Sequence, residues 1–196
     1  MIKYPTKKAL YTSEKTSAKN RGMTFEVLID ETNAFYRLMN KAIIYKKPTP
    51  IQIVRVDYPR RESAKITEAY YKTPSTTDYN GIYKGLYIDF DVKESKSETS
   101  FPLKNIHTHQ IDHLKNVHEH GGVAFILIYL KAHDEIYFLS YKALEKFLKR
   151  SEKGRKSIAY DELKENAIKI PLSYRPSVPY LNAIDQYLQK DKSQTL

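Results

Sequence analysis

The stretch "STTDYNGIYKGLYIDFDVKES", residues 75–95, gathers acidic residues and a lysine at spacings that suit one chemical site. From Leu86 to Val92 the even-numbered residues are apolar and the odd-numbered ones are polar or amphipathic. Because side chains alternate between the two faces of a strand, Asp89, Asp91 and Lys93 are expected to leave one face in a row. Alternation alone favours a half-exposed strand with a solvated face, so a second observation is needed to indicate chemistry.

Asp78 supplies that observation. Gly81 and Gly85 are predicted to bracket a turn that folds the strand containing Asp78 back beside Asp91. Two carboxylates at such a separation repel one another unless a cation lies between them. Mg²⁺, or Mn²⁺ as its substitute, is the natural occupant, because a hard divalent ion takes oxygen ligands and keeps several waters. With Lys93 able to position a water or to offset charge on a phosphate, this is the composition of a metal-dependent phosphodiesterase site.

The charge balance favours a polyanionic partner. Lys and Arg number 33 against 23 Asp and Glu, which gives a formal net charge of +10 and a pI of about 9.4. Nucleic acid is the commonest partner of such a chain. Residues 1–21, with Lys19 and Arg21 among their basic residues, have one acidic residue and no clear periodicity. They are predicted to form a flexible basic arm, with a plain solvated tail as the alternative.

Nothing in the sequence favours a membrane. The longest apolar run, "VAFILIYL" at 123–130, is well short of the roughly 20 residues that a spanning helix needs. The absence of cysteine excludes disulfides and thiolate zinc sites and agrees with a cytoplasmic location. Residues 22–196 contain no repeat and no long linker, and 196 residues suit one domain of ordinary size.

The hydrophobic pattern predicts an α/β domain with a mixed sheet and helices on both sides. Helices are expected at 22–39, 106–118, 141–150, 160–166 and 179–189, and strands at 43–44, 51–57, 66–72, 86–93, 123–130 and 135–140. The run at 123–130 is expected to be a central strand buried on both faces. Residues 58–65 are expected to form a turn or projection between two strands.

The acidic stretch resembles the PD-(D/E)xK nuclease motif. Pro74 and Asp78 would stand for its first half, and Asp91-Val92-Lys93 for its second. The wider context is more specific: "NRGMTFEVLIDETNAFY", "YKKPTPIQIVRVDYPRR", "EAYYKTPSTTDYNGIYKGLYIDFDVKES" and "TSFPLKNIHTHQIDHL" resemble, in order, the blocks of the RecU family of Holliday junction resolvases. The resemblance runs from about residue 20 to the C-terminus and is densest over 20–115.

The resemblance implies a restriction-endonuclease-like mixed sheet and a Mg²⁺- or Mn²⁺-dependent endodeoxyribonuclease. Such an enzyme would resolve four-way junctions by paired, symmetric nicks during DNA recombination and repair. The implied metal and catalytic residues are Asp78, Asp91, Lys93, Glu26, Gln110 and Thr76. The family pattern has glutamate where this chain has Asp91, one methylene shorter, which also keeps Asp89 as a possible ligand.

The resemblance further implies a homodimer with a protruding stalk at about residues 57–73. Basic groups of the stalk would bind phosphates, and an aromatic residue would stack on an exposed base. The expected DNA-binding residues of the stalk and the arm are Arg55, Tyr58, Arg60, Arg61, Lys65, Lys19 and Arg21. The basic loop at 152–156 would extend this surface. Recombinase and branch-migration proteins are the protein partners that the family suggests. On charge alone, the stalk is equally well a charged surface hairpin.

Five of the six histidines lie between His107 and His120, with His109 and His113 four residues apart. That spacing can hold a transition metal, but no third ligand accompanies it, so a place near DNA is favoured. Two other functions stay open. One is a different PD-(D/E)xK DNase acting on duplex DNA, and the other is a non-catalytic basic DNA-binding protein.

Overall fold

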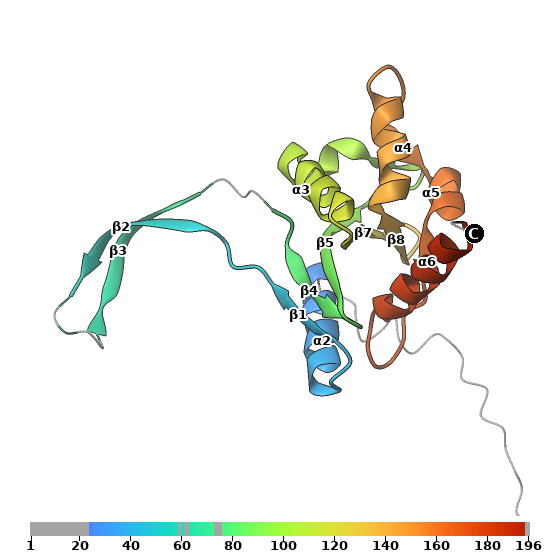
Figure 1. Ribbon diagram of the computed structural model, residues 1–196. Helices are drawn as coiled ribbons and strands as arrows, with labels where there is room; N and C mark the ends of the chain where they lie inside the picture. Colours follow the sequence, from blue (N-terminus) through green and yellow to red (C-terminus); the bar gives the residue numbers. More distant parts are fainter. Residues whose placement is uncertain (1–23, 59, 61–62, 73–75, 195–196) are drawn as a thin grey trace, which may run out of the picture.

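The computed structural model describes residues 24–58, 60, 63–72 and 76–194, without the side chains of residues 192 and 194. A six-stranded mixed sheet forms the centre of the fold, helices cover both of its faces, and a two-stranded ribbon projects from one edge (Figure 1). The strand order is β1-β4-β5-β7-β8-β10, in which β5 and β7 are parallel and all other neighbours are antiparallel. The predicted fold class, a mixed sheet flanked by helices, is confirmed.

The helices described are α2 (Phe25–Leu38), the 3₁₀ helix η2 (Leu103–Asn105), α3 (Thr108–Glu119), α4 (Tyr141–Ser151), α5 (Tyr160–Asn166) and α6 (Tyr180–Gln194). The sheet strands are β1 (Ile43–Lys46), β4 (Tyr79–Tyr83), β5 (Leu86–Ser95), β7 (Val123–Leu130), β8 (Glu135–Ser140) and β10 (Ile168–Ile170). Two further pairs are β2 (Ile51–Asp57) with β3 (Lys65–Tyr71), and β6 (Ser100–Pro102) with β9 (Ser157–Ala159). Among the described residues, no helix has both the length and the apolar character that crossing a membrane requires.

Helix α2 forms where the apolar stripe predicted it. Thr24 precedes the helix, and its hydroxyl accepts a hydrogen bond from Val27 N at 3.4 Å, which caps the first turn. Phe25 and Ile29 are fully buried against the sheet. The expectation that the buried stripe extends to Met39 is wrong, because the helix ends at Leu38 and Met39 is exposed.

The β4–β5 hairpin places the acidic residues, and its turn is tighter than predicted. Lys84 and Gly85 connect the strands with φ angles of +50° and +78°, as in a two-residue turn with both residues left-handed. Gly81 does not bracket the turn. It lies inside β4, where a Cβ atom would come 2.1 Å from the carbonyl oxygen of Ile43. Its lack of a side chain therefore lets β1 approach β4.

Strand β5 divides its side chains between the two layers of the core. Ile88, Phe90 and Val92 pack with α2 and α6, whereas the intervening positions face the layer that contains α3 and α4. Asp89 and Asp91 therefore lie under the α3 side, and both are 0% exposed. The alternative of a half-exposed strand with a solvated face is wrong, because α3 covers the face that these residues occupy and its His113 contacts Asp89.

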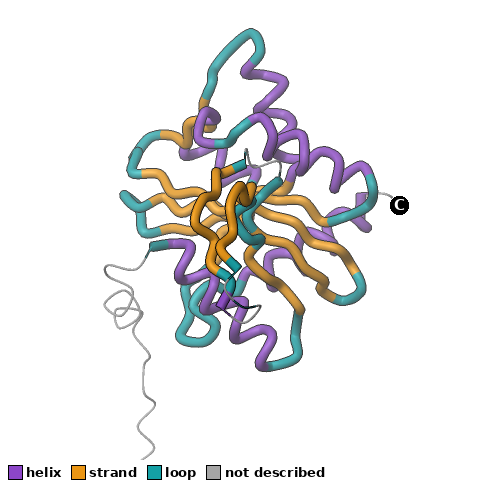
Figure 2. Tube along the Cα trace, turned by 90° about the vertical axis from the view of Figure 1, so that its left-hand side faces the viewer, coloured by secondary structure: helices purple, strands orange, loops and turns teal. Residues whose placement is uncertain are grey.

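The projection is a long antiparallel ribbon made by β2 and β3, and it is called the stalk below. It extends away from the body in Figure 1 and lies in front of the sheet in Figure 2. Every residue of β3 is exposed, and in β2 only Val56 is partly covered. The ribbon begins at Ile51, earlier than the expected boundary at 57. The predicted strands and the projection between them are confirmed.

The remaining elements follow the hydrophobic pattern closely. Strand β7 is buried on both faces and pairs with β8, as predicted. The helix expected from residue 106 begins at Thr108 instead, because η2 and two extended residues precede it. The predicted helices at 141–150, 160–166 and 179–189 correspond to α4, α5 and α6.

Candidate active site

Asp91 is a buried carboxylate whose only close cation is its neighbour on the same strand face. Lys93 Nζ lies 2.6 Å from Asp91 Oδ2, in a geometry outside that of a hydrogen bond. Within the described part of the chain, neither carboxylate oxygen of Asp91 accepts a hydrogen bond. Buried carboxyl oxygens that accept no hydrogen bond are uncommon, so Asp91 is a candidate to meet a group that the protein itself does not supply.

Asp78 lies beside Asp91, as the sequence predicts. It directly precedes β4, and strand pairing brings the start of β4 next to the middle of β5. Burial, followed by the neighbouring Asp78 carboxyl group, raises the pKa of Asp91 to about 8, and Lys93 only partly opposes this shift. Two adjacent carboxyl groups and one ammonium group therefore meet at the end of the β4–β5 hairpin that lies away from its turn.

This donor set fits a hard divalent cation. A cation placed between Asp78 and Asp91 would satisfy the two Asp91 oxygens and remove the repulsion between the carboxylates. Among the described residues, no three His, Asp or Glu side chains converge as a ready-made metal cage. Two carboxylates are nevertheless what Mg²⁺ commonly uses, because it keeps waters and takes substrate phosphate as the remaining ligands.

Asp89, two residues earlier on the same face, has the opposite environment. Its Oδ2 accepts hydrogen bonds from Lys47 Nζ at 2.7 Å and from the Tyr87 hydroxyl at 2.8 Å, and its Oδ1 accepts one from the Thr77 hydroxyl. His113 Nε2 of α3 lies 3.0 Å from the same Oδ2. To become a metal ligand as well, Asp89 would have to give up these partners.

Glu26 lies at the edge of the site on the first turn of α2. Its carboxylate pairs with Lys46 Nζ at 2.7 Å, and both side chains are about half exposed. Glu26 and Lys93 line the same cavity, of about 310 Å³, together with Val92 and the first residues of α2. The structure thus brings Glu26 near Lys93, as an exposed group that is separate from the pair Asp78 and Asp91.

Gln110 is buried on α3, where its amide oxygen accepts a hydrogen bond from His107 N at 3.1 Å and so caps the helix. An amide oxygen has a second lone pair, so this bond does not prevent it from binding an ion. Thr76 is partly buried, and its hydroxyl donates to the carbonyl oxygen of Thr77 at 3.3 Å. The roles of Gln110 and Thr76 as metal ligands stay predictions.

The expected DNA-binding residues divide between the stalk and parts outside the described residues. Arg55 and Lys65 lie on the stalk strands, and Tyr58 and Arg60 lie beyond the end of β2. Tyr58 is 69% exposed, as stacking on a base would require. The remaining expected contacts lie outside the described residues: Arg61, Lys19, Arg21 and the motif residue Pro74.

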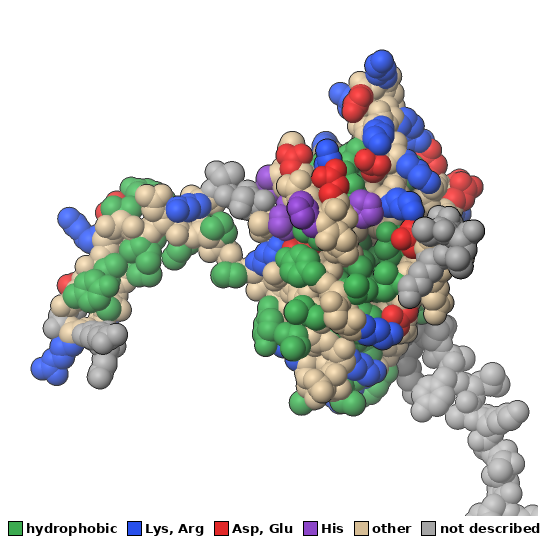
Figure 3. All heavy atoms as spheres, viewed as in Figure 1, with side chains coloured by type: hydrophobic (Ala, Val, Ile, Leu, Met, Phe, Trp, Pro, Cys, Tyr) green, Lys and Arg blue, Asp and Glu red, His purple; other side chains and the backbone are tan. Residues whose placement is uncertain are grey.

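The histidines do not build a metal site. The rings of His107 and His109 stack at 5.6 Å, and His113 turns instead toward Asp89. Histidine and acidic side chains gather over α3 in Figure 3, whereas Lys and Arg gather at the outer end of α4. The exposed residues of that end include Lys153 and Lys156 of the basic loop, whose contact with DNA stays a prediction.

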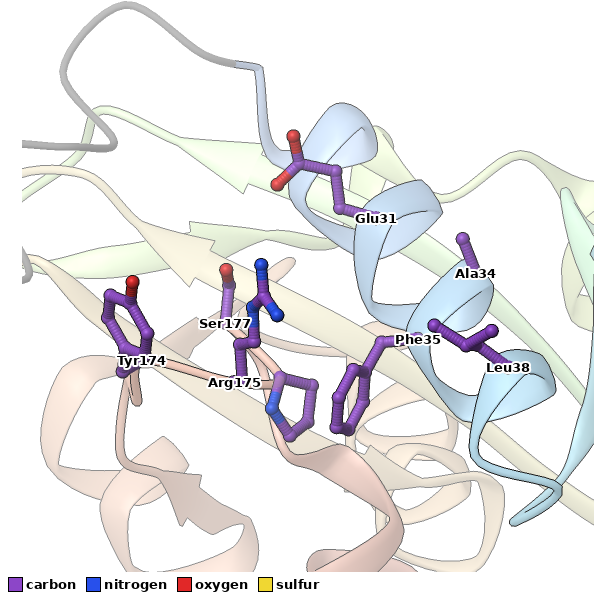
Figure 4. Close-up of a pocket in the computed structure, with 8 residues that line it drawn as sticks. Glu31, Ala34, Phe35, Leu38, Tyr174, Arg175 and Ser177 are labelled. Atoms are coloured by element: carbon purple, nitrogen blue, oxygen red, sulfur yellow. The ribbon is translucent and has the colours of Figure 1, made fainter.

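A second cavity, of about 350 Å³, lies between α2 and the loop before α6. It is lined by α2 residues such as Glu31 and Phe35 and by residues 174–177 of the loop before α6 (Figure 4). Asp78, Asp91 and Lys93 take no part in it, so it is separate from the carboxylate site.

Lys47 and Thr77 were missed by the sequence reasoning. Lys47 is one of two adjacent lysines in "YKKPTP", and Thr77 is one of two adjacent threonines before Asp78. Their partner Asp89 lies 42 and 12 residues away in the chain. The only available signal was a buried-strand aspartate that needed donors, and that signal did not say which residues would provide them.

Comparison with solved structures finds a distant similarity. The chain matches Archaeoglobus fulgidus Hjc, a Holliday junction resolvase from an archaeal hyperthermophile, with a TM-score of 0.41 and 12% sequence identity. The match covers 72% of this chain and 93% of that chain.

Comparison of sequences gives closer relatives. The chain is 51% identical over 179 residues to a protein of Staphylococcus carnosus, covering 91% of this chain and 86% of that protein. It is 52% identical over 194 residues to a protein of Bacillus licheniformis, covering 95% and 97%. Both relatives are named Holliday junction resolvase RecU. The RecU family model, described as Recombination protein U, matches residues 20–186. The chain therefore belongs to the RecU family.

Proposed function

We propose that this protein is a divalent-metal-dependent endodeoxyribonuclease that resolves Holliday junctions by paired, symmetric nicks. The observation that carries the proposal is the buried Asp91 with Asp78 and Lys93 beside it, in a chain whose curated relatives are named Holliday junction resolvases. Cytoplasmic location and contacts with recombinase and branch-migration proteins stay predictions.

Each residue of the cluster has a role that follows from its environment. Asp78 and Asp91 would hold the ion, because their oxygens are adjacent and those of Asp91 lack donors. When bound, Mg²⁺ or Mn²⁺ supplies Lewis acidity toward the scissile phosphate and lowers the pKa of a bound water. Lys93, 2.6 Å from Asp91 and 16% exposed at its side chain, is placed to orient the attacking water or to offset charge on the phosphate. Glu26 borders the same cavity and would act on water or on the leaving group from the exposed side.

The stalk supports binding to a branched DNA structure. It is a basic and aromatic ribbon without a buried core of its own, and it stands clear of the sheet (Figure 1). Arg55, Arg60 and Lys65 would bind phosphates near the crossover, and Tyr58 would stack on an exposed base. Because these contacts are mainly to the DNA backbone, we expect affinity to fall steeply with salt concentration.

A homodimer would provide two cleavage sites on opposed strands of a nearly two-fold symmetric junction. The sheet offers an apolar surface suited to a second copy. Ile43, Ile82 and Tyr87 are neighbours across β1, β4 and β5 on one face, and all three are exposed. An uncovered apolar sheet face next to the stalk is typical of an association surface.

Cleavage of a labelled mobile four-way junction tests the proposal. With Mg²⁺ we expect paired nicks at symmetric positions, and with EDTA no product. The Asp78→Ala protein should keep junction binding, measured by gel shift in EDTA, and lose cleavage.

Other outcomes would separate the remaining functions. Equal cleavage of linear duplex and four-way junction would favour a general DNase and exclude a resolvase. Binding of junctions by the wild type without any metal-dependent cleavage would favour a non-catalytic DNA-binding protein. A wild type that is monomeric at all concentrations by light scattering, free and with junction, would exclude paired cleavage by a dimer.

A further inference from the structure

Two segments connect the stalk to the central sheet and are called its legs here. Both legs contact one buried carboxylate, that of Asp89. The incoming leg leaves β1 at Lys47 and reaches β2 through "PTP", residues 48–50. The outgoing leg leaves β3 at Tyr71 and is described again from Thr76 to the start of β4. Lys47 Nζ donates to Asp89 from the first leg, and the Thr77 hydroxyl donates to Asp89 from the second. The carboxylate of Asp89 therefore joins the two legs at the point where the stalk meets the sheet.

Further hydrogen bonds hold the two legs of the stalk together at this point. Lys47 Nζ also donates to Thr77 Oγ1 at 3.0 Å, and the backbone N–H of Lys47 donates to the carbonyl oxygen of Asp78 at 2.7 Å. The Asp89 side chain is 0% exposed and that of Lys47 only 18%. Water therefore competes little for these bonds, and each is stronger than an exposed one would be.

Lys47, Thr77 and Asp89 are connected through the chain to the proposed metal ligands Asp78 and Asp91. Thr77 immediately precedes Asp78, whose own carbonyl group is held by Lys47. Asp89 lies two residues before Asp91 on the same strand face. Asp78 stands outside β4, so strand pairing alone does not hold it, whereas Asp91 is held in the middle of β5 by both β4 and β7.

We propose that Asp89, with Lys47 and Thr77, is a clamp that positions the metal ligand Asp78 and fixes it relative to the stalk. In this arrangement Asp89 is a positioning residue and contacts neither the metal nor DNA. The proposal rests on the metal-dependent function proposed above. Its consequence is that the geometry of the ion site depends on where the stalk is anchored.

Two single substitutions, one on each leg of the stalk, test the clamp. Lys47→Met removes the cation from Asp89, and Thr77→Val removes the hydroxyl from the second leg with little change in volume. Because Asp78 regains conformational freedom that metal binding must then restrict, we expect each variant to weaken Mn²⁺ binding by about tenfold. Mn²⁺ affinity is measured without DNA, from the electron paramagnetic resonance signal of the free ion. The Mg²⁺ concentration for half-maximal cleavage should rise by a similar factor, and excess Mg²⁺ should restore most of the rate.

Three further variants distinguish a positioning role of the clamp from an effect of its charge or of folding. Lys72→Met removes an exposed lysine from the other leg of the stalk, at a residue whose backbone N–H bonds to Pro50 O, and should leave Mn²⁺ affinity unchanged. Lys47→Arg keeps the cation and should recover part of the affinity. The double variant Lys47→Met/Thr77→Val should weaken Mn²⁺ binding by less than the product of the single effects, since both act through the same clamp.

The outcomes distinguish this inference from the proposed function. If Lys47→Met and Thr77→Val bind Mn²⁺ as the wild type does while only their unfolding midpoints fall, the cluster is merely structural and the clamp is refuted. If the wild type itself shows no metal-dependent cleavage, the proposed function fails, whatever the variants do.

Discussion

The surroundings of Asp89 and Asp91 differ completely, although the two residues lie two positions apart on the same face of β5 and are equally buried. Asp89 is enclosed by donors from the stalk base, from Tyr87 and from α3. Asp91 has one lysine at 2.6 Å, a second carboxyl group beside it, and no hydrogen-bond donor among the described residues. The described residues supply hydrogen-bond donors to both oxygens of Asp89, whereas neither oxygen of Asp91 accepts a hydrogen bond from them.

The difference teaches how one strand can combine a structural anion with a reactive one. A buried carboxylate with several donors stabilises the residues that surround it. A buried carboxylate beside another carboxylate destabilises the apoprotein and gains when a cation arrives. Burial alone therefore does not distinguish a candidate metal ligand from a structural carboxylate. The groups that surround each carboxylate make that distinction.

Asp91→Asn should give the largest effect on activity. The amide cannot supply an anionic ligand, so we expect cleavage of a four-way junction to fall at least about 10³-fold, which is about 4 kcal/mol of transition-state stabilisation. Single-turnover cleavage at saturating Mg²⁺ measures this loss. Junction binding in EDTA should be unchanged, and an active Asp91→Asn protein would contradict the assignment of the ligand.

Asp89→Asn should give the largest effect on stability, larger than that of Asp91→Asn. Loss of the charge leaves the Lys47 ammonium group unpaired in a nearly buried position, so we expect the free energy of unfolding to fall by about 3 kcal/mol. Under the same metal-free conditions Asp91→Asn should destabilise less, because the loss of the ion pair with Lys93 is partly offset by removal of a buried carboxyl group that lies beside Asp78. Urea titration measures both, and equal destabilisation by the two variants would refute the contrast.

Divalent cations should stabilise the wild type and not Asp91→Asn. At a Mg²⁺ concentration 100 times the dissociation constant, binding to the folded state alone adds about 2.7 kcal/mol. We expect the unfolding midpoint of the wild type to rise with Mg²⁺ or Mn²⁺ and that of Asp91→Asn to stay constant. A similar rise in both proteins would place the ion elsewhere.

Glu135 provides a third carboxylate and the smallest expected effect. Burial alone would raise its pKa, but hydrogen bonds from Lys169, Tyr137 and Tyr160 outweigh burial and lower the pKa from 4.5 to about 2. Because the folded pKa lies below the unfolded one, its stabilisation is complete above about pH 4.5 and is lost as the pH falls toward 2.

The unfolding free energy of Glu135→Gln should accordingly differ from that of the wild type by about 1 kcal/mol at neutral pH, allowing for screening by solvent. The difference should shrink between pH 4.5 and 2. A difference that does not depend on pH over this range would show that packing, and not charge, explains the effect.

Much of the fold followed from local pattern. The stripe of α2, the alternation of β5 and the continuous apolar run of β7 each predicted the right element, because period and length are properties of a short segment. The role of Gly81 was predicted wrongly. A glycine pair suggests a turn, but Gly81 is required by the approach of β1, which a local pattern does not reveal.

The candidate site was predictable in part. Asp78 and Asp91 meet because a hairpin brings adjacent strands together, and the charges on either side of a short turn are visible in the sequence. The alternative of a solvated face on β5 was wrong, because α3 covers that face and its His113, which contacts Asp89, lies 24 residues further along the chain.

The sequence by itself determined the strands and helices, the hairpin that pairs Asp78 with Asp91, and the projecting basic ribbon, because each depends on residues close together in the chain. Only the tertiary structure decided which aspartate of β5 accepts several hydrogen bonds and which accepts none from the described residues. Lys47 and His113 reach Asp89 from 42 and 24 residues away. Such partners meet only when β1, β5 and α3 have packed against one another.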